Sequence, residues 1–362
     1  MPPTTITENS VWGPSVSKSP IRPLGDTINL SHGSGGRDMH RLLEQLILPT
    51  LCSGPIDDGD AASIAIAELI DQGDRLAFTT DSYTITPLVF PGGDIGSLAV
   101  NGTVNDLAMS GAIPRYLSCA LIIEEGFSIK ALSSILQSMR TAADQANIRI
   151  IAGDTKVVHR GAADGLFINT AGIGVIPSKR QLGREHIRNG DIVIVSGFIG
   201  DHGAAVLAAR DELQLAIPVD SDCQPLHVLT EALLSVCPNT RIMRDATRGG
   251  VASVLNELIA ASSFGIQIME TLIPVRPVVR GACEILGLDP LYLANEGTMV
   301  AIIPEQDEQR ALAAMQAQAA GVHARRIGKV TDHYPGLVSL LTQMGGERLI
   351  DIPSGELLPR IC

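Results

Sequence analysis

Aromatic residues are scarce in this sequence, at 3% of 362 residues. Because the bases of single-stranded nucleic acid stack on aromatic side chains, this scarcity argues against a nucleic-acid platform. Positive charge is also limited: 27 Lys and Arg stand against 39 Asp and Glu, and the net charge is −12. A protein that binds phosphate backbones normally has a basic surface, so the charge argues against the same class. A nucleotide ligand is still allowed, since Mg²⁺ can bridge carboxylates and phosphates.

Paired cysteines are absent as well. No two of the six cysteines form a C-x-x-C pair, so neither a zinc site nor a disulfide framework is indicated. No apolar run is long enough to span a bilayer, and residues 1–23 lack the apolar region of a signal peptide. We therefore expect a cytoplasmic protein with free thiols. The cysteines are Cys52, Cys119, Cys223, Cys237, Cys283 and Cys362.

The length favours two domains over one. Alternating strand and helix patterns in both halves predict an α/β or α+β fold. We expect a disordered extension over residues 1–27, an N-terminal domain over 28–177 and a C-terminal α/β domain over 178–344. Glycine and proline then interrupt the pattern, which predicts a flexible tail over 345–362.

Apolar spacing predicts the main elements. We expect helices over 38–51, 95–109, 128–146, 204–210 and 250–262. We expect strands over 75–80, 148–152, 166–176, 191–196 and 299–303. On this prediction Asp81 follows the end of one strand, and Asp154 follows the end of another.

Acidic residues recur beside glycines and at predicted strand ends. A single Asp in such a place is more often a turn residue or a helix N-cap. Several together favour a site for one or more Mg²⁺ ions, which prefer oxygen ligands and share them with phosphates. The candidates are Asp60, Asp81, Asp106, Asp154 and Asp245.

A glycine-rich segment, His32-Gly33-Ser34-Gly35-Gly36, precedes a predicted helix. Its backbone N–H groups could therefore bind a phosphate. It matches neither the P-loop nor the dinucleotide-binding fingerprint, so a plain turn is the alternative.

Lys156 and Glu296 are the candidates for acid–base chemistry. Lys156 follows Asp154, and Glu296 lies among apolar and small residues just before a strand. A buried Glu has a raised pKa and accepts protons better near neutral pH. A Lys paired with it would stay protonated and act electrostatically. For either residue, a surface charge or a structural ion pair is the alternative.

The last residue, Cys362, follows Leu358-Pro359-Arg360-Ile361. It does not form a prenylation box, which needs its Cys four residues from the end. Most terminal cysteines have no function, but the proline, the arginine and the upstream glycines indicate an arm that presents a nucleophilic thiol. The α-carboxylate would raise the pKa of this thiol and Arg360 would lower it.

Together these segments resemble the HypE family of carbamoyl dehydratases, which mature nickel–iron hydrogenases, over essentially the whole chain after Ile28. HypE proteins belong to the superfamily of aminoimidazole ribonucleotide synthetase, selenophosphate synthetase and thiamine-monophosphate kinase. The terminal Pro-Arg-Ile-Cys is the specific element, because the ATP-binding relatives lack it. The other matches are the segments 32–36, 80–83, 91–93, 105–106, 110–115, 153–157, 200–203, 245–250 and 295–297.

The resemblance implies a two-domain aminoimidazole ribonucleotide synthetase-like fold, whose N-terminal domain pairs its sheet with that of a second subunit in a homodimer. It implies ATP and Mg²⁺ as cofactors. It implies nucleotide contacts from Gly33, Ser34, Gly35, Gly36, Asp81, Asn105, Asp154, Thr155 and Asp245. The five acidic candidates would bind metal, with Asp58 left open beside Asp60. Cys362, Lys156 and Glu296 would be catalytic.

The implied reaction is the ATP-dependent dehydration of an S-carboxamide on Cys362 to an S-thiocyanate. The carbamoyltransferase HypF would supply the carboxamide, and a complex of HypC and HypD would receive cyanide as an iron ligand. Phosphorylation of the carbonyl oxygen would turn a poor leaving group into phosphate. A small-molecule kinase or synthetase of the superfamily is one alternative. A nucleotide-binding scaffold without chemistry is another.

Overall fold

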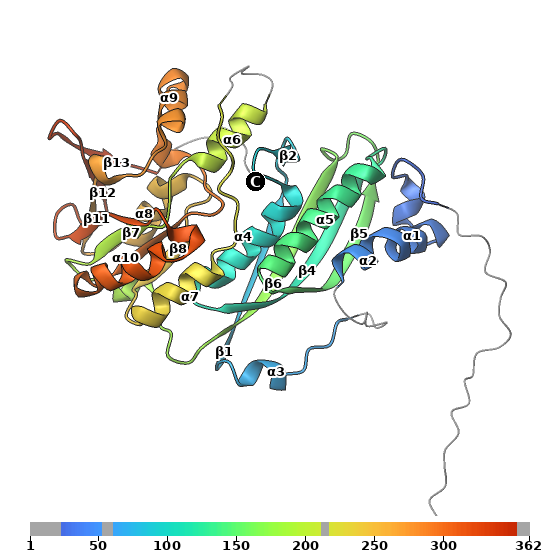
Figure 1. Cartoon of the computed structure of the whole chain (residues 1–362), viewed down its shortest axis with the longest axis horizontal. Helices are drawn as coiled ribbons and strands as arrows, with labels where there is room; N and C mark the ends of the chain where they lie inside the picture. The colour runs from blue at the N-terminus through green and yellow to red at the C-terminus, as the bar shows by residue number, and fades with distance from the viewer. Residues whose placement is uncertain (1–22, 53–60, 211–216, 353–362) are drawn as a thin grey trace, which may run out of the picture.

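The computed structural model describes residues 23–52, 61–210 and 217–352. Figure 1 shows two large β-sheets, one formed by the N-terminal half and one by the C-terminal half. The predicted alternation of strands and helices in both halves is confirmed. Across the described residues, no helix combines the length and the apolar character needed to cross a membrane.

Within the described residues, the N-terminal sheet has four strands in the order β1–β6–β4–β5. β6 pairs antiparallel with both β1 and β4, and β4 pairs parallel with β5. Since neighbouring strands lie about 4.8 Å apart, the edge strands β1 and β5 are separated by roughly 14 Å. The strands are β1 (Arg75–Tyr83), β4 (Ile113–Glu124), β5 (Arg149–Val158) and β6 (Leu166–Ile176).

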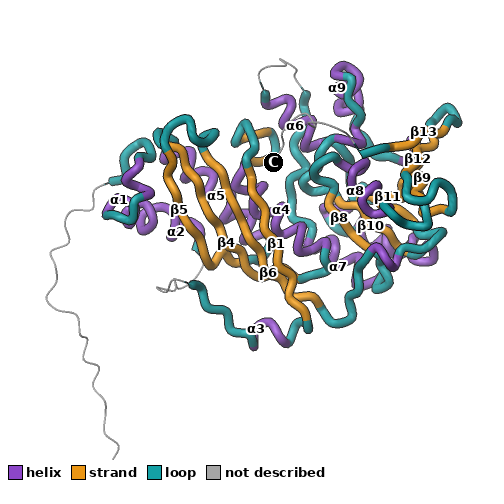
Figure 2. The backbone as a smooth tube through the Cα atoms, turned by 180° about the vertical axis from the view of Figure 1, so that it is seen from behind, coloured by secondary structure: helices purple, strands orange, loops and turns teal. Residues whose placement is uncertain are grey.

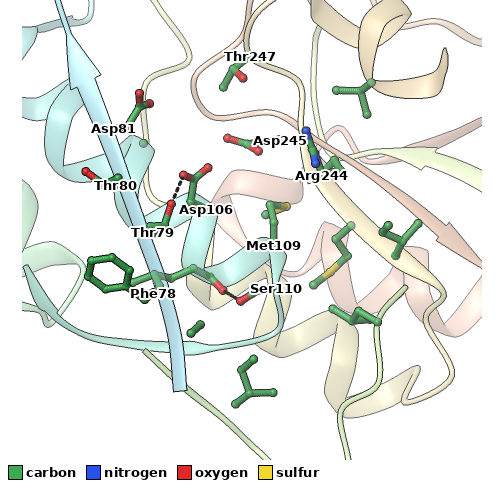
Figure 3. A pocket seen from close by; sticks show the side chains of 18 of the residues that line it. Phe78, Thr79, Thr80, Asp81, Asp106, Met109, Ser110, Arg244, Asp245 and Thr247 are labelled. Atoms are coloured by element: carbon green, nitrogen blue, oxygen red, sulfur yellow. Dashed lines mark hydrogen bonds between the residues drawn. The ribbon is translucent and has the colours of Figure 1, made fainter. Parts of the chain in front are cut away.

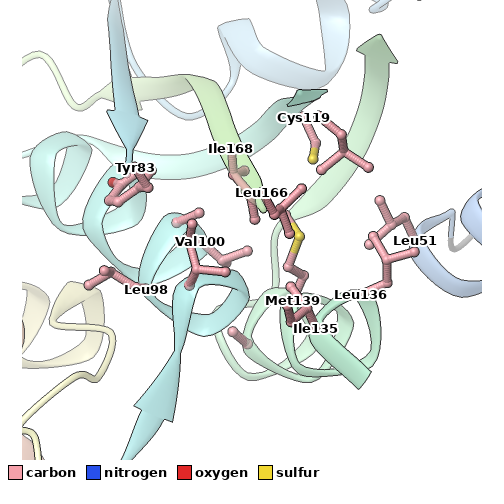
Figure 4. Close-up of a cluster of buried hydrophobic side chains, with 14 of the residues drawn as sticks. Leu51, Tyr83, Leu98, Val100, Cys119, Ile135, Leu136, Met139, Leu166 and Ile168 are labelled. Carbon is pink, nitrogen blue, oxygen red and sulfur yellow. The ribbon is translucent and has the colours of Figure 1, made fainter. Parts of the chain in front are cut away.

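One face of this sheet is covered by α4 (Ile95–Met109) and α5 (Ile129–Gln145), as Figure 1 shows. Small residues in α4 allow the close approach. A Cβ on Gly96 would lie 2.4 Å from the backbone oxygen of Ile135, and one on Gly102 would lie 2.3 Å from the Tyr83 hydroxyl. Figure 4 shows the resulting core, which includes Leu98, Val100, Ile135, Leu136, Met139, Leu166 and Ile168.

The opposite face of the sheet is largely open in the part of the chain that the structure describes (Figure 2). Only its lower end is packed, where Leu69 of α3 (Ala67–Ile70) joins a small cluster with Tyr116. Strand alternation directs Phe78 to this face, because Thr79 beside it contacts α4. Phe78 is 71% exposed and Leu76 is 63% exposed. This apolar surface is therefore available for packing.

Short helical elements precede the sheet. The predicted helix over 38–51 is confirmed as three consecutive segments, whose middle one is π-helical. Ordered backbone contacts begin before Ile28, because Ile129 N–H donates to the oxygen of Asp26. The expected extension over 1–27 is therefore wrong for its last residues, and residues 1–22 lie outside the described part. The elements are η1 (Leu30–Gly33), α1 (Arg37–Leu42), η2 (Leu43–Ile47) and α2 (Leu48–Leu51).

The C-terminal sheet has, among the described residues, seven strands in the order β13–β12–β9–β11–β7–β10–β8. Its neighbours pair antiparallel except β12 with β9. Its central strands are buried on both faces, against α8 on one side and against α7 and α10 on the other. The strands are β7 (Ile192–Val195), β8 (Ile242–Asp245), β9 (Gly265–Met269), β10 (Met299–Ile303), β11 (Arg325–Thr331), β12 (Val338–Leu341) and β13 (Glu347–Ile350).

The remaining elements are the helices of the C-terminal half and a short hairpin of the N-terminal half. The helices are α6 (Asp201–Ala209), α7 (His227–Val236), α8 (Gly250–Ile259), α9 (Pro277–Leu286) and α10 (Glu308–Gln316). The short strands β2 (Val89–Phe90) and β3 (Gly93–Asp94) form a hairpin just before α4.

Five predicted boundaries are wrong by three residues or more. Helix α6 begins at Asp201 instead of at 204, and α8 ends at Ile259 instead of at 262. The other three involve a strand. β1 continues through Asp81 to Tyr83, and β5 continues through Asp154 to Val158, because each keeps a paired neighbour over that length. The tail predicted from Gly345 begins later, since Glu347–Ile350 forms β13 against β12. In these three cases strand pairing outweighs a local sequence of polar residues and glycines. Asp81 and Asp154 therefore lie within strands.

Candidate active site

A cavity of about 870 Å³ lies between the two halves of the chain. Its size is typical of small-molecule sites. The wall comes from β1 and α4 of the N-terminal half, and from β8 and the loop after it in the C-terminal half (Figure 3). Lining residues include Phe78, Thr79, Thr80, Asp81, Tyr83, Asp106, Arg244, Asp245, Thr247, Arg248 and Glu296.

Three predicted aspartates meet at this cavity although they are far apart in sequence. Asp81 comes from β1, Asp106 from α4 and Asp245 from the end of β8. Figure 3 shows their carboxylates gathered between β1 and the β8 segment. The Thr79 hydroxyl donates to Asp106 at 2.8 Å, and an Arg248 nitrogen lies 3.6 Å from an Asp81 oxygen.

Ionisation of Asp106 and Asp245 is unfavourable in this cavity. Burial first, and then the charge of Asp106, raise the pKa of Asp245 to about 7. Burial also raises the pKa of Asp106, against the lowering effect of the hydrogen bond from Thr79. Both shifts arise because an anion is costly beside other anions in a poorly solvated place. A bound cation would relieve that cost.

The donor set fits Mg²⁺ bound together with a nucleotide. Among the described residues, no three acidic, His or Cys side chains are placed to hold a metal ion by themselves. Mg²⁺ rarely uses such a cage, since one or two carboxylates, waters and phosphate oxygens complete its coordination. Asp81, Asp106 and Asp245 offer oxygen donors of this kind. Of the two other candidates, Asp154 lies on β5 and Asp60 lies outside the described residues.

Glu296 also lines the cavity and is only 3% exposed. Burial raises its pKa well above the ordinary value, and the charges of Asp245 and Asp222 add to the shift. Such a carboxyl group holds a proton more tightly than an exposed one, so its carboxylate is a stronger base. Its apolar neighbours in the sequence predict this burial.

Asn105 is not brought to the cavity wall. Its amide nitrogen donates to the backbone oxygens of Gln224 at 3.1 Å and Glu296 at 3.2 Å. Its amide oxygen accepts the N–H of Leu226 at 2.7 Å. The side chain is 1% exposed, so it ties α4 to the C-terminal half.

Asp154, Thr155 and Lys156 lie on β5, at the other edge of the N-terminal sheet. The Lys156 nitrogen is 3.1 Å from Asp154, and the two side chains are 63% and 54% exposed. Lys156 therefore pairs with Asp154 instead of with Glu296. Thr155 points to the opposite, helix-covered face and is buried.

The glycine segment also lies beside β5. A Cβ on Gly33 would lie 2.6 Å from the backbone nitrogen of Val157, so glycine is required there. Gly35 has a φ of +76°, which glycine adopts readily, and Ser34 and Gly36 lie on either side of it.

The predicted site residues therefore fall into two groups. Those at the cavity form a cleft group: Asp81, Asp106, Asp245 and Glu296. The others form a β5 group: Gly33, Ser34, Gly35, Gly36, Asp154, Thr155 and Lys156. Cys362 lies outside the described residues.

Several residues at the site escape sequence reasoning. Arg248 and Thr247 belong to the Asp-Ala-Thr-Arg-Gly-Gly segment that opens at Asp245, and this segment could have suggested them. Thr79 and Asp222 have no such signal, because each reaches the site through a contact with a distant part of the chain.

Two family models cover most of the chain. The AIR synthase related protein N-terminal domain matches residues 58–176, and the C-terminal domain of the same family matches residues 188–337. Among curated proteins, the carbamoyl dehydratase HypE of Rhodobacter capsulatus is 48% identical over 93% of this chain and 98% of its own length. HypE of Escherichia coli strain K12 is 46% identical over 93% of this chain and 100% of its own length.

Solved structures agree with the sequence matches. HypE in complex with ATP superposes with a TM-score of 0.86 at 45% identity, over 92% of this chain and 99% of that one. HypE from a HypE–HypF complex superposes with a TM-score of 0.74 at 47% identity, over 77% of this chain and 90% of that one. A thiamine-monophosphate kinase from Stenotrophomonas maltophilia, at 19% identity and a TM-score of 0.57 over 74% and 85%, shares the fold alone. The predicted two-domain fold is thus confirmed, and this chain belongs to the HypE family of carbamoyl dehydratases.

Proposed function

We propose that this protein dehydrates an S-carboxamide on its own Cys362 to an S-thiocyanate at the expense of ATP, and so supplies cyanide ligands for the iron of nickel–iron hydrogenase. One observation carries the proposal: a buried glutamate and three aspartates from both halves line a single nucleotide-sized cavity. The relatives named carbamoyl dehydratase and the HypE structure with ATP support it.

The cleft group provides for phosphoryl transfer. Asp81, Asp106 and Asp245 would hold Mg²⁺ bound together with ATP, and Arg248 adds a positive charge beside Asp81. When bound, the metal supplies neutralisation of the charge that develops on the transferred phosphoryl group. Asp106 and Asp245 would thereby gain the cation that their raised pKa values call for.

Glu296 acts as the base. The carboxamide oxygen attacks the terminal phosphorus of ATP, and the bond from that phosphorus to ADP breaks. The nitrogen then loses its two protons, the carbon–oxygen bond breaks, and inorganic phosphate leaves as the carbon–nitrogen triple bond forms. Glu296 accepts one proton from the nitrogen, because its raised pKa suits proton transfer near neutral pH, and the leaving phosphate takes the other as hydrogen phosphate.

The β5 group enters the same site from a second copy of the chain. Within one copy it lies across the N-terminal sheet from the cleft group, so one copy cannot bring both groups to one ligand. The exposed face around Leu76 and Phe78 supports a homodimer formed by sheet packing. Asp154 and Lys156 lie on this same face and would be carried onto the partner's cleft. Lys156 then acts as a positive charge on the phosphates or carboxamide.

Partner proteins supply and receive the carbon unit. A HypE relative at 47% identity was crystallised with HypF, which supports HypF as the carbamoyl donor protein. We propose the HypC–HypD complex as the acceptor of cyanide. The Cys362 sulfur carries the group between these sites.

The test is mass spectrometry of the C-terminal peptide after incubation with HypF, carbamoyl phosphate and ATP. The expected result is a carboxamide adduct on Cys362 that loses the mass of one water only when ATP and Mg²⁺ are present. Persistence of the carboxamide with bound ATP would contradict the proposal.

A Cys362→Ala variant separates the dehydratase from a small-molecule kinase. The dehydratase loses all product, whereas a kinase would continue to consume ATP with its own substrate. Binding of ATP by the variant, measured by calorimetry, controls for an intact cleft.

A further inference from the structure

Glu296 reaches the cavity from an irregular segment, residues 293–297, between the short helix Pro290–Tyr292 and β10. Because this segment lacks ladder pairing of its own, the direction of the Glu296 side chain depends on what fixes the backbone. Asp222, Gln224 and Asn105 hold the backbone at Glu296 and Gly297. Gly203 and Ala246 hold the two residues before them, through the oxygen of Ala294 and the N–H of Asn295.

Asp222 makes the most direct contact. One carboxylate oxygen accepts the N–H of Glu296 at 2.9 Å, and the other accepts the N–H of Gly297 at 3.1 Å. Each carboxylate oxygen accepts one of these bonds, so a side chain that offered only donors could not replace it. Two consecutive peptide groups are thus held by one side chain.

The surrounding contacts hold the opposite sides of the same peptides. Gln224 donates to the oxygen of Gly297, and Asn105 donates to the oxygen of Glu296, both at 3.2 Å. A Cβ on Gly297 would lie 1.8 Å from the backbone oxygen of Asp222. The two segments are therefore in direct backbone contact, which only glycine permits.

We propose that Asp222 is a positioning residue for the base Glu296: it acts on the reaction through Glu296, by holding the Glu296 backbone in place. This inference rests on the proposed function. Asp222 comes from the chain between α6 and α7 and itself lines a second, neighbouring cavity of about 550 Å³ rather than the reaction cavity. Its charge also adds to the raised pKa of Glu296, after burial and Asp245.

Replacement of Asp222 should slow dehydration without weakening ATP binding. Displacement of a catalytic group by about 1 Å can cost roughly 100-fold in rate. We expect Asp222→Ala to lower the single-turnover rate of thiocyanate formation by about 10- to 100-fold, with the KM for ATP within about twofold of normal. Asp222→Asn keeps one acceptor oxygen, so its rate should fall between those of the normal enzyme and Asp222→Ala. It also serves as the test variant if the alanine form does not fold. Asp220→Asn, an exposed acid two residues away, is the matched control and should keep full activity.

A double-mutant cycle distinguishes positioning from general damage. If Asp222 acts only through Glu296, then Asp222→Ala should slow a Glu296→Gln enzyme no further. A further drop in that background, or a raised KM with unchanged turnover, would overturn the inference. Full activity of Glu296→Gln would instead refute the base in the proposed function. If Glu296→Gln loses activity but Asp222→Ala keeps it, the positioning role of Asp222 is refuted and Glu296 stands as the base.

Discussion

The cleft group and the β5 group both contain aspartates that the sequence analysis singled out, but the surroundings of these aspartates are opposite. Asp245 and Glu296 are crowded with other acids in a poorly solvated cavity, and their pKa values are raised. Asp154 lies on an open sheet face and already has a positive partner in Lys156. The buried acids of the cleft group therefore favour a bound cation. The exposed side chains of the β5 group leave a surface that another chain can cover. The difference supports the proposal that each group is half of a site.

The cleft group depends most on Glu296. Glu296→Gln keeps the shape of the side chain but removes its ability to accept a proton. We expect dehydration to fall by about 10²- to 10⁴-fold, the usual contribution of a general base, while ATP still binds. The measurement is single-turnover mass spectrometry of the C-terminal peptide. The matched control is the exposed Glu305→Gln, and an equal loss in that variant would point to unspecific damage.

Mixed dimers test whether the two groups share a site. Lys156→Ala and Asp245→Asn should each be nearly inactive alone. If the β5 group of one copy completes the cleft of the other, mixing and exchange of subunits should restore about a quarter of normal activity, since half of the dimers would each hold one intact site. If both groups served one copy, mixing would restore nothing.

The sheet face that carries the β5 group can be blocked directly. Phe78→Asp places a charge in the proposed interface, and we expect the dimer to weaken by about 100-fold, as an unpaired buried charge costs several kcal/mol. Sedimentation velocity measures the shift to monomer. Ile285→Asp on α9, at a side chain that is also 73% exposed, should leave the dimer unchanged. A Phe78→Asp variant that stays dimeric would place the interface elsewhere.

The sequence predicted the elements better than the grouping of the site. Helix Ile95–Met109 and strands Leu166–Ile176 and Met299–Ile303 have the bounds that apolar spacing predicts, because burial sets both the pattern and the fold. Spacing along the chain could not show that Asp81 and Asp154 lie on opposite edges of one sheet, since strand order is decided by long-range pairing. Asp222 was missed for the same reason. Its partners lie 74 and 75 residues away.

The cleft group should make ATP binding depend on pH. The raised pKa of Asp245, about 7, means that Mg²⁺ must displace a proton from it below that pH. Affinity for Mg²⁺–ATP should therefore fall by about tenfold from pH 8 to pH 6. Calorimetry in two buffers of different ionisation enthalpy should also detect the released proton. Lys156→Ala should change the affinity but keep this pH dependence, because Asp154 and Lys156 do not contact Asp245 within one copy.

The smallest expected effect concerns the stability of the empty protein. Asp245 has a higher pKa in the folded chain than its ordinary value of 3.8, so the folded state binds more protons between about pH 4 and pH 7 and loses stability as the pH rises through that window. Asp245→Asn removes this penalty. Without nucleotide or metal, we expect its Tm to exceed that of the unmodified protein by roughly 2–4 °C at pH 8, and the difference to disappear near pH 4. Asp154→Asn, in the solvated β5 group, should show no such gain. A gain of equal size there would mean that the two groups are not electrostatically different, and scanning calorimetry of both variants decides between these outcomes.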